Sequence, residues 1–225
     1  MKFKSIFKYI AKFWDYVWHD DSLLSWILAI IIAFLIISYI VFPILKFIFK
    51  TEYPLVTVVS GSMEHKLGKY NDICGHILNY YKKDFDHFWF YCGPWYEKRN
   101  ISREQFENFP FKHGLNIGDL VVVVGTKPEN IKIGDVIVFK SKFLRYPIIH
   151  RVISKSYKNG SLIINTKGDH NPRQNEDDIN ITPDRIYGKA VLKVPFLGYP
   201  KIWLFKFVTK VIGGVNNELI LSKMR

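Results

Sequence analysis

Two distant parts of this sequence carry residue types that could together perform nucleophilic chemistry. Ser60, Gly61 and Ser62 follow a short apolar run, and glycine lets the backbone turn there so that a serine hydroxyl is left accessible. Far along the chain, His150 and Asp169 could supply the base and the acid that activate such a hydroxyl. The same tripeptide is also ordinary loop composition, so the chemistry depends on whether these residues meet in the fold.

A predicted β-hairpin brings His150 and Asp169 together. Residues 148–157 and 161–166 are strand-like, and the pair Asn159-Gly160 between them is a strong signal for a two-residue type I′ turn. Around that turn, the residue numbers of each directly opposed pair sum to 319. The numbers of His150 and Asp169 also sum to 319, so the two residues should lie opposite each other. Provided the ladder has no bulge, we expect their Cβ atoms about 4.5–5.5 Å apart on one face. A cross-strand pair without a catalytic role is the alternative.

The first 46 residues have the composition of a membrane anchor. Residues 23–45 carry no charge, and at about 1.5 Å per residue they span about 34 Å, enough for a hydrocarbon core of about 30 Å. We expect a retained transmembrane helix over 22–46, because the run is too long for a signal-peptide core. Before it, apolar residues recur every three or four positions with lysines between them, which predicts an interfacial amphipathic helix over 1–21.

The rest of the chain divides into a β-rich domain and a C-terminal tail. Asp119 and Asp135 each belong to a Gly-Asp turn that precedes a β-branched run, so we assign both carboxylates to turn hydrogen bonds. The strand-like pattern predicts a mainly β domain over 47–195. Residues 196–225 begin apolar but are interrupted by lysines, which favours a membrane-associated interfacial helix and tail over a second span.

Residues 70–113 form an aromatic-rich insertion that contains both cysteines. The capping-box pattern of Ser102 and Gln105 predicts a short helix there. Outside the cytoplasm, Cys74 and Cys92 could form a disulfide that stabilises by about 3 kcal/mol in the chain-entropy model. Free buried thiols are one alternative and a metal site with nearby histidines is another, but the irregular spacing argues against a metal.

The net charge of +12 on 225 residues has three possible explanations. The protein could bind a nucleic acid, it could bind an anionic lipid surface, or its exterior could simply be basic. The lysines gather beside the apolar runs, as they do in proteins that face a membrane. There is no zinc-finger spacing, RNP-like aromatic motif or dense arginine cluster. We therefore expect a lipid bilayer, and no nucleic acid, as a partner.

Four motifs stand in a fixed order in this chain: Ser60-Gly61-Ser62-Met63, the paired Gly-Asp strands, Ile149-His150-Arg151-Val152, and Thr166-Lys167-Gly168-Asp169. Together they resemble the type I signal peptidases. The histidine that precedes Arg151 makes the chain resemble the archaeal and endoplasmic-reticulum branch of the family. Bacterial enzymes carry a catalytic lysine at the position of this histidine. The resemblance covers roughly residues 55–69 and 115–195, and it does not extend to the insertion.

The resemblance implies a role for each matched residue. Ser62 would be the nucleophile, His150 the general base and Asp169 the acid, with Ser60 near the oxyanion site beside the Ser62 amide. It also implies a signal-peptidase-like antiparallel β-sheet domain that needs no cofactor. The family tends to have a second aspartate about six residues after the first; Asn175 stands there, and among the acidic residues behind it we favour Asp177.

His65 is the main departure from the family pattern, because the family often has proline two residues after the methionine. The loop that follows the nucleophile could therefore be less rigid here. His65 could also compete with His150 as the base, although three residues along an irregular turn give no assured geometry.

Together with these observations, the resemblance implies a membrane-bound serine endopeptidase that cleaves N-terminal signal peptides from secretory preproteins. We expect a single pass through the cell membrane, a cytoplasmic N-terminus and an extracytoplasmic catalytic domain at the membrane surface; the Sec translocon could be a further partner. A self-cleaving Ser/Lys protease of the repressor type is a rival enzyme, but its base would be lysine. The other rival is a catalytically inactive membrane-tethered β module that binds nascent chains or the translocon.

Overall fold

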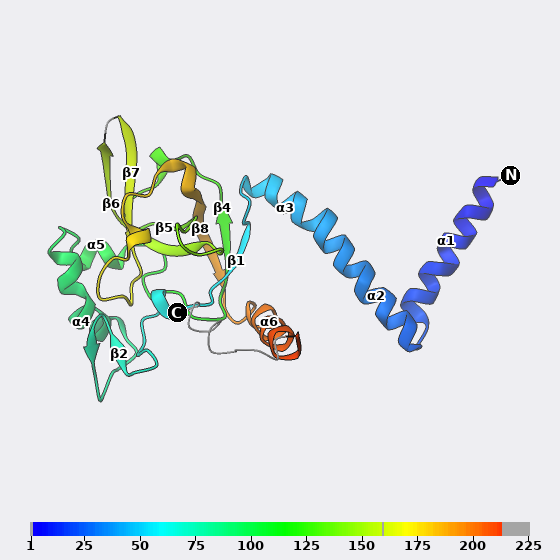
Figure 1. Ribbon diagram of the computed structural model, residues 1–225, viewed down its shortest axis with the longest axis horizontal. Helices are drawn as coiled ribbons and strands as arrows, with labels where there is room; N and C mark the ends of the chain where they lie inside the picture. The colour runs from blue at the N-terminus through cyan, green and yellow to red at the C-terminus, as the bar shows by residue number, and fades with distance from the viewer. Residues whose placement is uncertain (1, 159, 213–225) are drawn as a thin grey trace. The chain divides into compact units, whose positions relative to one another are not determined.

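The computed structural model describes residues 2–158 and 160–212, and its contacts divide the chain into two compact units, Met1–Ile48 and Phe49–Arg225 (Figure 1). The first unit is helical: α1 (Lys2–His19), α2 (Leu23–Ile36), a π-helical turn (Ile37–Val41) and the start of α3 (Phe42–Phe49). The second unit contains the β-sheet, the insertion and α6 (Tyr199–Ile212).

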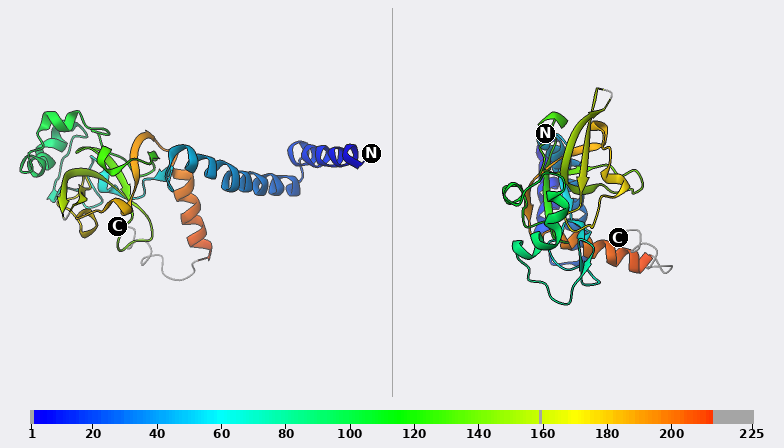
Figure 2. Two further views of the ribbon diagram at one scale, coloured as in Figure 1. Left: turned by 90° about the horizontal axis from the view of Figure 1, so that it is seen from above. Right: turned by 90° about the vertical axis from the view of Figure 1, so that its left-hand side faces the viewer.

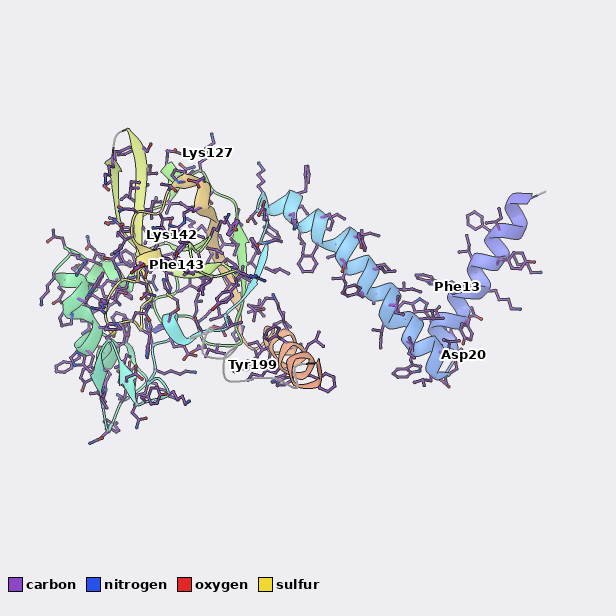
Figure 3. The ribbon with its side chains drawn as sticks, in the orientation of Figure 1. Phe13, Asp20, Lys127, Lys142, Phe143 and Tyr199 are labelled. Carbon is purple, nitrogen blue, oxygen red and sulfur yellow. A yellow bond between two sulfur atoms is a disulfide. The ribbon has the colours of Figure 1, made fainter. Side chains whose placement is uncertain are left out.

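A bend separates α1 from α2 in the first unit. The Ser22 hydroxyl caps α2 by accepting a hydrogen bond from the Ser25 amide (3.3 Å), as expected for a serine at this position. Asp20, labelled at the bend in Figure 3, accepts from the Ser22 amide (2.9 Å). The Ser25 hydroxyl donates to the carbonyl of Val17 (2.9 Å), so the two helices are joined by a buried hydrogen bond.

α2, the π-helical turn and α3 form one continuous helix, Leu23–Phe49, with a mean hydropathy of 3.0. Among the described residues it is the one helix long and apolar enough to cross a membrane. The π-helical turn comes just before Pro43, which has no N–H to donate and whose ring would collide with the carbonyl one turn earlier. The proline therefore widens the helix locally without ending it.

The second unit is built around a six-stranded antiparallel sheet in the order β1-β4-β8-β5-β6-β7. The strands are β1 (Leu55–Thr57), β4 (Leu120–Val124), β5 (Val136–Phe139), β6 (Ile148–Lys158), β7 (Ser161–Lys167) and β8 (Ile186–Val194). The expected mainly β architecture is thus confirmed. β5 is buried along its whole length, in keeping with its unbroken apolar sequence, whereas β4 alternates between buried and half-buried residues.

The two Gly-Asp turns are structural, as predicted. Gly118 and Gly134 have φ values of 91° and 92°, a left-handed conformation that favours glycine. Asp119 accepts from the amide three residues before it (2.9 Å), and Asp135 does the same (2.8 Å). Each carboxylate therefore closes the turn that leads into a strand.

The β6–β7 ladder contains a bulge that the sequence pattern does not reveal. From Lys158↔Ser161 to Ser154↔Asn165 the paired numbers sum to 319, as predicted, but the next pair is Val152↔Thr166. Ile153 is the extra residue, and its side chain is buried in the aromatic cluster of the insertion. The predicted alignment of residues 150 and 169 is therefore wrong. The first turn residue, Asn159, lies outside the described residues.

The insertion forms a layer of its own, with β2 (Asp72–Ile73), β3 (His76–Ile77), α4 (Phe85–Glu97) and α5 (Arg103–Glu107). The capping box of Ser102 and Gln105 is present, so the short helix predicted there is confirmed. α4 was not predicted, because Gly93 and Pro94 in its second half are poor helix formers; its buried aromatic side chains outweigh them. Figure 2 shows α4 and α5 together on one side of the sheet.

The C-terminal helix α6 begins beside the first Gly-Asp turn. The amide of Gly198 donates to the carbonyl of Gly118 (2.9 Å). The Tyr199 ring packs so closely on Gly118 that a Cβ added to this glycine would lie only 2.3 Å from the ring. Tyr199 is labelled at the start of α6 in Figure 3. Trp203 and Leu204 on this helix are exposed, as an interfacial helix requires; the predicted tail beyond residue 212 falls outside the described residues.

Candidate active site

Ser62 sits in a 3₁₀ turn (Gly61–Met63) a few residues after the end of β1. Met63 is fully buried and anchors the turn in the core, while Ser62 is only half-buried. The carboxylate of Glu64 accepts from the amide of Ile117 (2.9 Å), which holds the loop against the turn before β4. The hydroxyl oxygens of Ser60 and Ser62 lie 3.2 Å apart. The loop is therefore fixed on both sides of its central serine.

His150 lies on β6 and links Ser62 to a carboxylate. Its Nε2 is 3.0 Å from the Ser62 hydroxyl oxygen, and its Nδ1 is 2.6 Å from a carboxylate oxygen of Asp178. An ionised carboxylate can only accept, so the imidazole proton belongs on Nδ1 and Nε2 is the acceptor for the serine proton. His150 is only 3% exposed, so this arrangement is shielded from water. Serine, histidine and aspartate thus form a connected chain of hydrogen bonds.

Asp178 ends the short 3₁₀ turn Glu176–Asp178 and is fully buried. It also accepts from the Thr166 hydroxyl (2.6 Å) and from the Asn175 amide (2.8 Å). Burial by itself raises the pKa of this carboxyl, but the charge and hydrogen bond of His150 and the other two donors outweigh it and hold the pKa below its ordinary value. Asp178 is therefore an ionised group that fixes the orientation of the imidazole.

Asp169, the residue expected beside His150, faces a different set of partners. The Arg151 guanidinium donates to both carboxylate oxygens (2.9 and 2.7 Å), the Tyr96 hydroxyl donates to one (3.0 Å) and His65 Nε2 to the other (2.9 Å). A bulge of one residue turns the following side chains to the opposite face, which is why His150 and Asp169 do not meet. Burial raises the pKa of Asp169, but Arg151 and His65 lower it far more, well below its ordinary range.

The side chain of His65 is only 7% exposed and is stacked on Phe88, with ring centroids 3.5 Å apart. Its Nε2 is occupied by Asp169, so the structure does not place this imidazole as a second base for Ser62. Burial lowers the pKa of His65, and the hydrogen bond to Asp169 only partly offsets this effect. His65, at the position where the resembled family often has proline, is therefore a structural group behind the loop.

Asp177 and the two cysteines also lie away from His150. Asp177 accepts from the Ser141 hydroxyl (2.5 Å) and the Lys142 amide (2.6 Å), so it holds the loop between β5 and β6, where Figure 3 labels Lys142. Cys74 and Cys92 are joined by a disulfide. Within the described residues, no group of three or more histidine, cysteine or acidic side chains is arranged to hold a metal ion.

Asp178 is the residue that sequence reasoning missed. It stands directly behind the favoured Asp177, in a run of three acidic residues that sequence alone does not rank. One local signal was available: Asn175 and Asp178 form a capping box, which turns the aspartate side chain back toward the start of the turn. Its contact with His150 depends on long-range packing, which no local pattern reveals.

Comparisons with known proteins give two relatives of this chain, while no protein-family model matches it. The signal peptidase complex catalytic subunit SEC11 of Zygosaccharomyces rouxii is 34% identical over 92 residues, 37% of this chain and 54% of that protein. SEC11 of Colletotrichum graminicola is 29% identical over 104 residues, 42% of this chain and 60% of that protein. The chain thus spans little more than half the length of these relatives. With the antiparallel sheet, these similarities confirm that the chain resembles the type I signal peptidases of the endoplasmic-reticulum branch.

Proposed function

We propose that this protein is a membrane-anchored serine endopeptidase that removes N-terminal signal peptides from secretory preproteins. The observation that carries the proposal is the chain of contacts from Ser62 through His150 to Asp178. This arrangement supplies a nucleophile, a base and an orienting acid within hydrogen-bond distance of one another. Similarity to signal peptidase catalytic subunits supports the choice of substrate.

In the proposed mechanism, His150 Nε2 takes the proton of Ser62 as the serine oxygen attacks the scissile carbonyl carbon. Asp178 stabilises the imidazolium through Nδ1–H, so we assign the acid role to Asp178 in place of Asp169. His150 then gives the proton to the leaving amine as the peptide bond breaks, and an acyl-enzyme remains on Ser62. Water, deprotonated by the same imidazole, hydrolyses this ester and restores the serine. No cofactor takes part in these steps.

The oxyanion of the tetrahedral intermediate would be held by the Ser62 amide and the Ser60 hydroxyl. The position of the Ser60 oxygen, 3.2 Å from the Ser62 oxygen, supports this role, because a group attached to Ser62 would lie within its reach. Each such donor is worth about 3 kcal/mol of transition-state stabilisation. Ser60→Ala is accordingly expected to lower kcat by about a hundredfold while leaving Ser62 in place.

The substrate would lie extended beside β1, which is one of the two edge strands of the described sheet and ends a few residues before Ser62. Main-chain hydrogen bonds along such an edge supply affinity, and small pockets for alternate side chains supply specificity. From the family resemblance we infer that these pockets admit only small residues before the scissile bond.

We further propose that Leu23–Phe49 spans the cell membrane once, with the N-terminus in the cytoplasm and the catalytic domain outside it. Lysines that precede the span support this orientation. The disulfide between Cys74 and Cys92 also supports it, because disulfides persist in oxidising compartments. α1 and α6 would lie in the membrane interface, and the Sec translocon is a candidate partner.

The test is cleavage of a purified preprotein by the full chain in lipid, with Ser62→Ala, His150→Ala and His150→Lys as variants. Cleavage at the signal-peptide junction by the wild type alone is the expected result. Cleavage that survives Ser62→Ala would remove the nucleophile assignment. Activity retained by His150→Lys would favour Ser/Lys chemistry, and no cleavage by the wild type would favour an inactive binding module.

A further inference from the structure

The aromatic insertion contacts each of four buried charged or ionisable residues that lie behind Ser62. Phe88 stacks on His65, and the Phe106 ring lies 4.7 Å from the Arg151 guanidinium. The other two, Lys167 and Asp169, are contacted by side chains from the end of α4. Aromatic side chains of the insertion therefore cover these four residues and shield them from water.

Tyr96 makes the most specific of these contacts. Its side chain is fully buried, its hydroxyl donates to Asp169 (3.0 Å), and its ring centroid lies 4.9 Å from the Lys167 ammonium nitrogen. The Lys167 ammonium in turn donates to the carbonyl oxygens of Gly168 (3.0 Å) and Asp169 (3.1 Å). Tyr96 thus contacts the side chains of both Lys167 and Asp169, which fix the backbone conformation at residues 167–169.

The disulfide ties the same backbone to α4. Cys74, joined to Cys92 of α4, donates its amide hydrogen to the carbonyl of His170 (3.0 Å). The amide of His170 donates to the carbonyl of Ser62 (2.9 Å). A short path of one disulfide and two hydrogen bonds therefore leads from α4 to the backbone of the candidate nucleophile.

The backbone at Gly168 packs directly against the catalytic pair, without room for even a Cβ between them. A Cβ built on Gly168 would lie 2.7 Å from the carbonyl oxygen of Ser62 and 2.8 Å from His150 Nε2. Contacts under 3.0 Å require something to shift. Because the amide of His170 donates to the carbonyl of Ser62, a displacement of the 168–170 backbone would shift the serine relative to its base.

We propose that the insertion is a brace for the catalytic loop, in which Tyr96 and the Cys74–Cys92 disulfide are positioning residues for Ser62 and His150. This inference rests on the proposed function for its effect on catalysis. It gives the insertion a role within the enzyme itself, through contacts to residues 168–170 and not to the substrate. Loss of either tie should loosen the loop without removing any group that reacts.

The experiment compares Tyr96→Phe and the double variant Cys74→Ser/Cys92→Ser with wild type, using the full chain in lipid. Tyr80→Phe is the matched control, because it removes a hydroxyl from a tyrosine of the same insertion that is 72% exposed. Preprotein cleavage gives kcat and KM. Hydrogen exchange of peptides that cover residues 60–65 and 168–171 reports the loop directly, and thermal unfolding reports global stability.

We expect Tyr96→Phe to lower kcat about tenfold at nearly constant KM, because misplaced reacting groups slow the chemical step more than they weaken binding. Exchange in both peptides should become faster in Tyr96→Phe and in the double variant, but not in Tyr80→Phe. If wild type cleaves and Tyr96→Phe has wild-type kcat and wild-type exchange, the brace is refuted. If wild type does not cleave, the proposed function fails, and hydrogen exchange alone tests the brace. Unchanged protection of the loop peptides in both Tyr96→Phe and the double variant would then refute the brace. Should the double variant fail to fold, the kcat and exchange of Tyr96→Phe still decide whether the brace exists.

Discussion

At the scale of single residues, two buried aspartates near Ser62 have different partners and therefore different consequences. Asp178 contacts the imidazole of His150, whereas Asp169 neutralises the buried guanidinium of Arg151. The first pair fixes the tautomer and orientation of the imidazole that we propose as the base. The second compensates a charge that would be costly to bury alone.

Substitution separates the two aspartates. Asp178→Asn should lower kcat by about 10⁴-fold, because an amide at this position favours the wrong imidazole tautomer. Its cost in stability should be smaller, about 1–3 kcal/mol, because one buried donor loses its acceptor. Asp169→Asn should instead destabilise the fold by about 3–5 kcal/mol, because it leaves Arg151 uncompensated. Cleavage kinetics and thermal unfolding of both variants check this. A large loss of stability in Asp178→Asn with full kcat per folded molecule would contradict it.

His65 makes stability depend on pH. Its pKa is lowered from about 6.5 by burial, so the unfolded chain binds a proton more readily than the folded one. Its contribution to stability is therefore fully present above about pH 6.5 and is lost as the pH falls toward the lower folded value. Asp169 adds a second loss at still lower pH, where its own depressed pKa is approached.

We expect the midpoint temperature of unfolding to fall in wild type as the pH drops below about 6.5, and to fall less in His65→Gln, which keeps an N–H for Asp169 but does not titrate. His76→Gln, which removes an exposed imidazole, is the control and should follow wild type. Thermal unfolding at a series of pH values measures the difference. Parallel curves for wild type and His65→Gln would show that His65 is not the titrating group.

At the scale of elements, glycine turns set the positions of the strands around the site. Gly134 precedes β5 with φ of 92°, and a Cβ there would lie 2.2 Å from the Phe109 ring. Gly160, in the β6–β7 turn, has φ of 76° but open space around its Cα. Substitution by alanine therefore causes both backbone strain and a steric clash at Gly134. At Gly160 the same substitution causes backbone strain alone.

Gly134→Ala should cost about 3 kcal/mol, from left-handed strain of about 1–2 kcal/mol together with overpacking against Phe109. Gly160→Ala, the matched control, should cost only about 1 kcal/mol, because strain acts without a clash. Urea unfolding followed by tryptophan fluorescence gives both values. Equal losses at the two positions would mean that the Phe109 ring moves aside at little cost.

At the scale of the whole molecule, the apolar helix Leu23–Phe49 is the candidate membrane span among the described residues. Its apolar residues are exposed in the structure, as a lipid-facing helix requires and as a soluble core helix would not tolerate. Charge placed in the middle of such a helix should be far more costly than charge placed near its end.

Leu35→Arg should weaken membrane integration by about 2.5–3.5 kcal/mol, because the charge would lie near the bilayer centre. Phe47→Arg, close to the end of the helix, is the control and should integrate like wild type because its side chain can reach the interface. Resistance to alkaline extraction measures integration. Equal extraction of both variants would show that the helix does not span the bilayer.

The sequence by itself determined the features that arise from local patterns. Apolar length predicts the helix of the first unit, β-branched runs and Gly-Asp turns predict the strands, and the order of the motifs indicates the family. The serine loop and His150 were identified in this way, because each stands in a short, recognisable motif.

Only the tertiary structure decided which carboxylate His150 meets. The bulge at Ile153 results from packing of that side chain into the aromatic cluster, a long-range contact that strand periodicity does not encode. It turns Asp169 toward Arg151 and leaves the place beside His150 to Asp178. α4 escaped prediction for the same reason, because buried aromatic contacts outweigh the poor helix propensity of Gly93 and Pro94. Local signals therefore identified the candidate nucleophile and its candidate base, and packing between distant segments decided which carboxylate contacts that base.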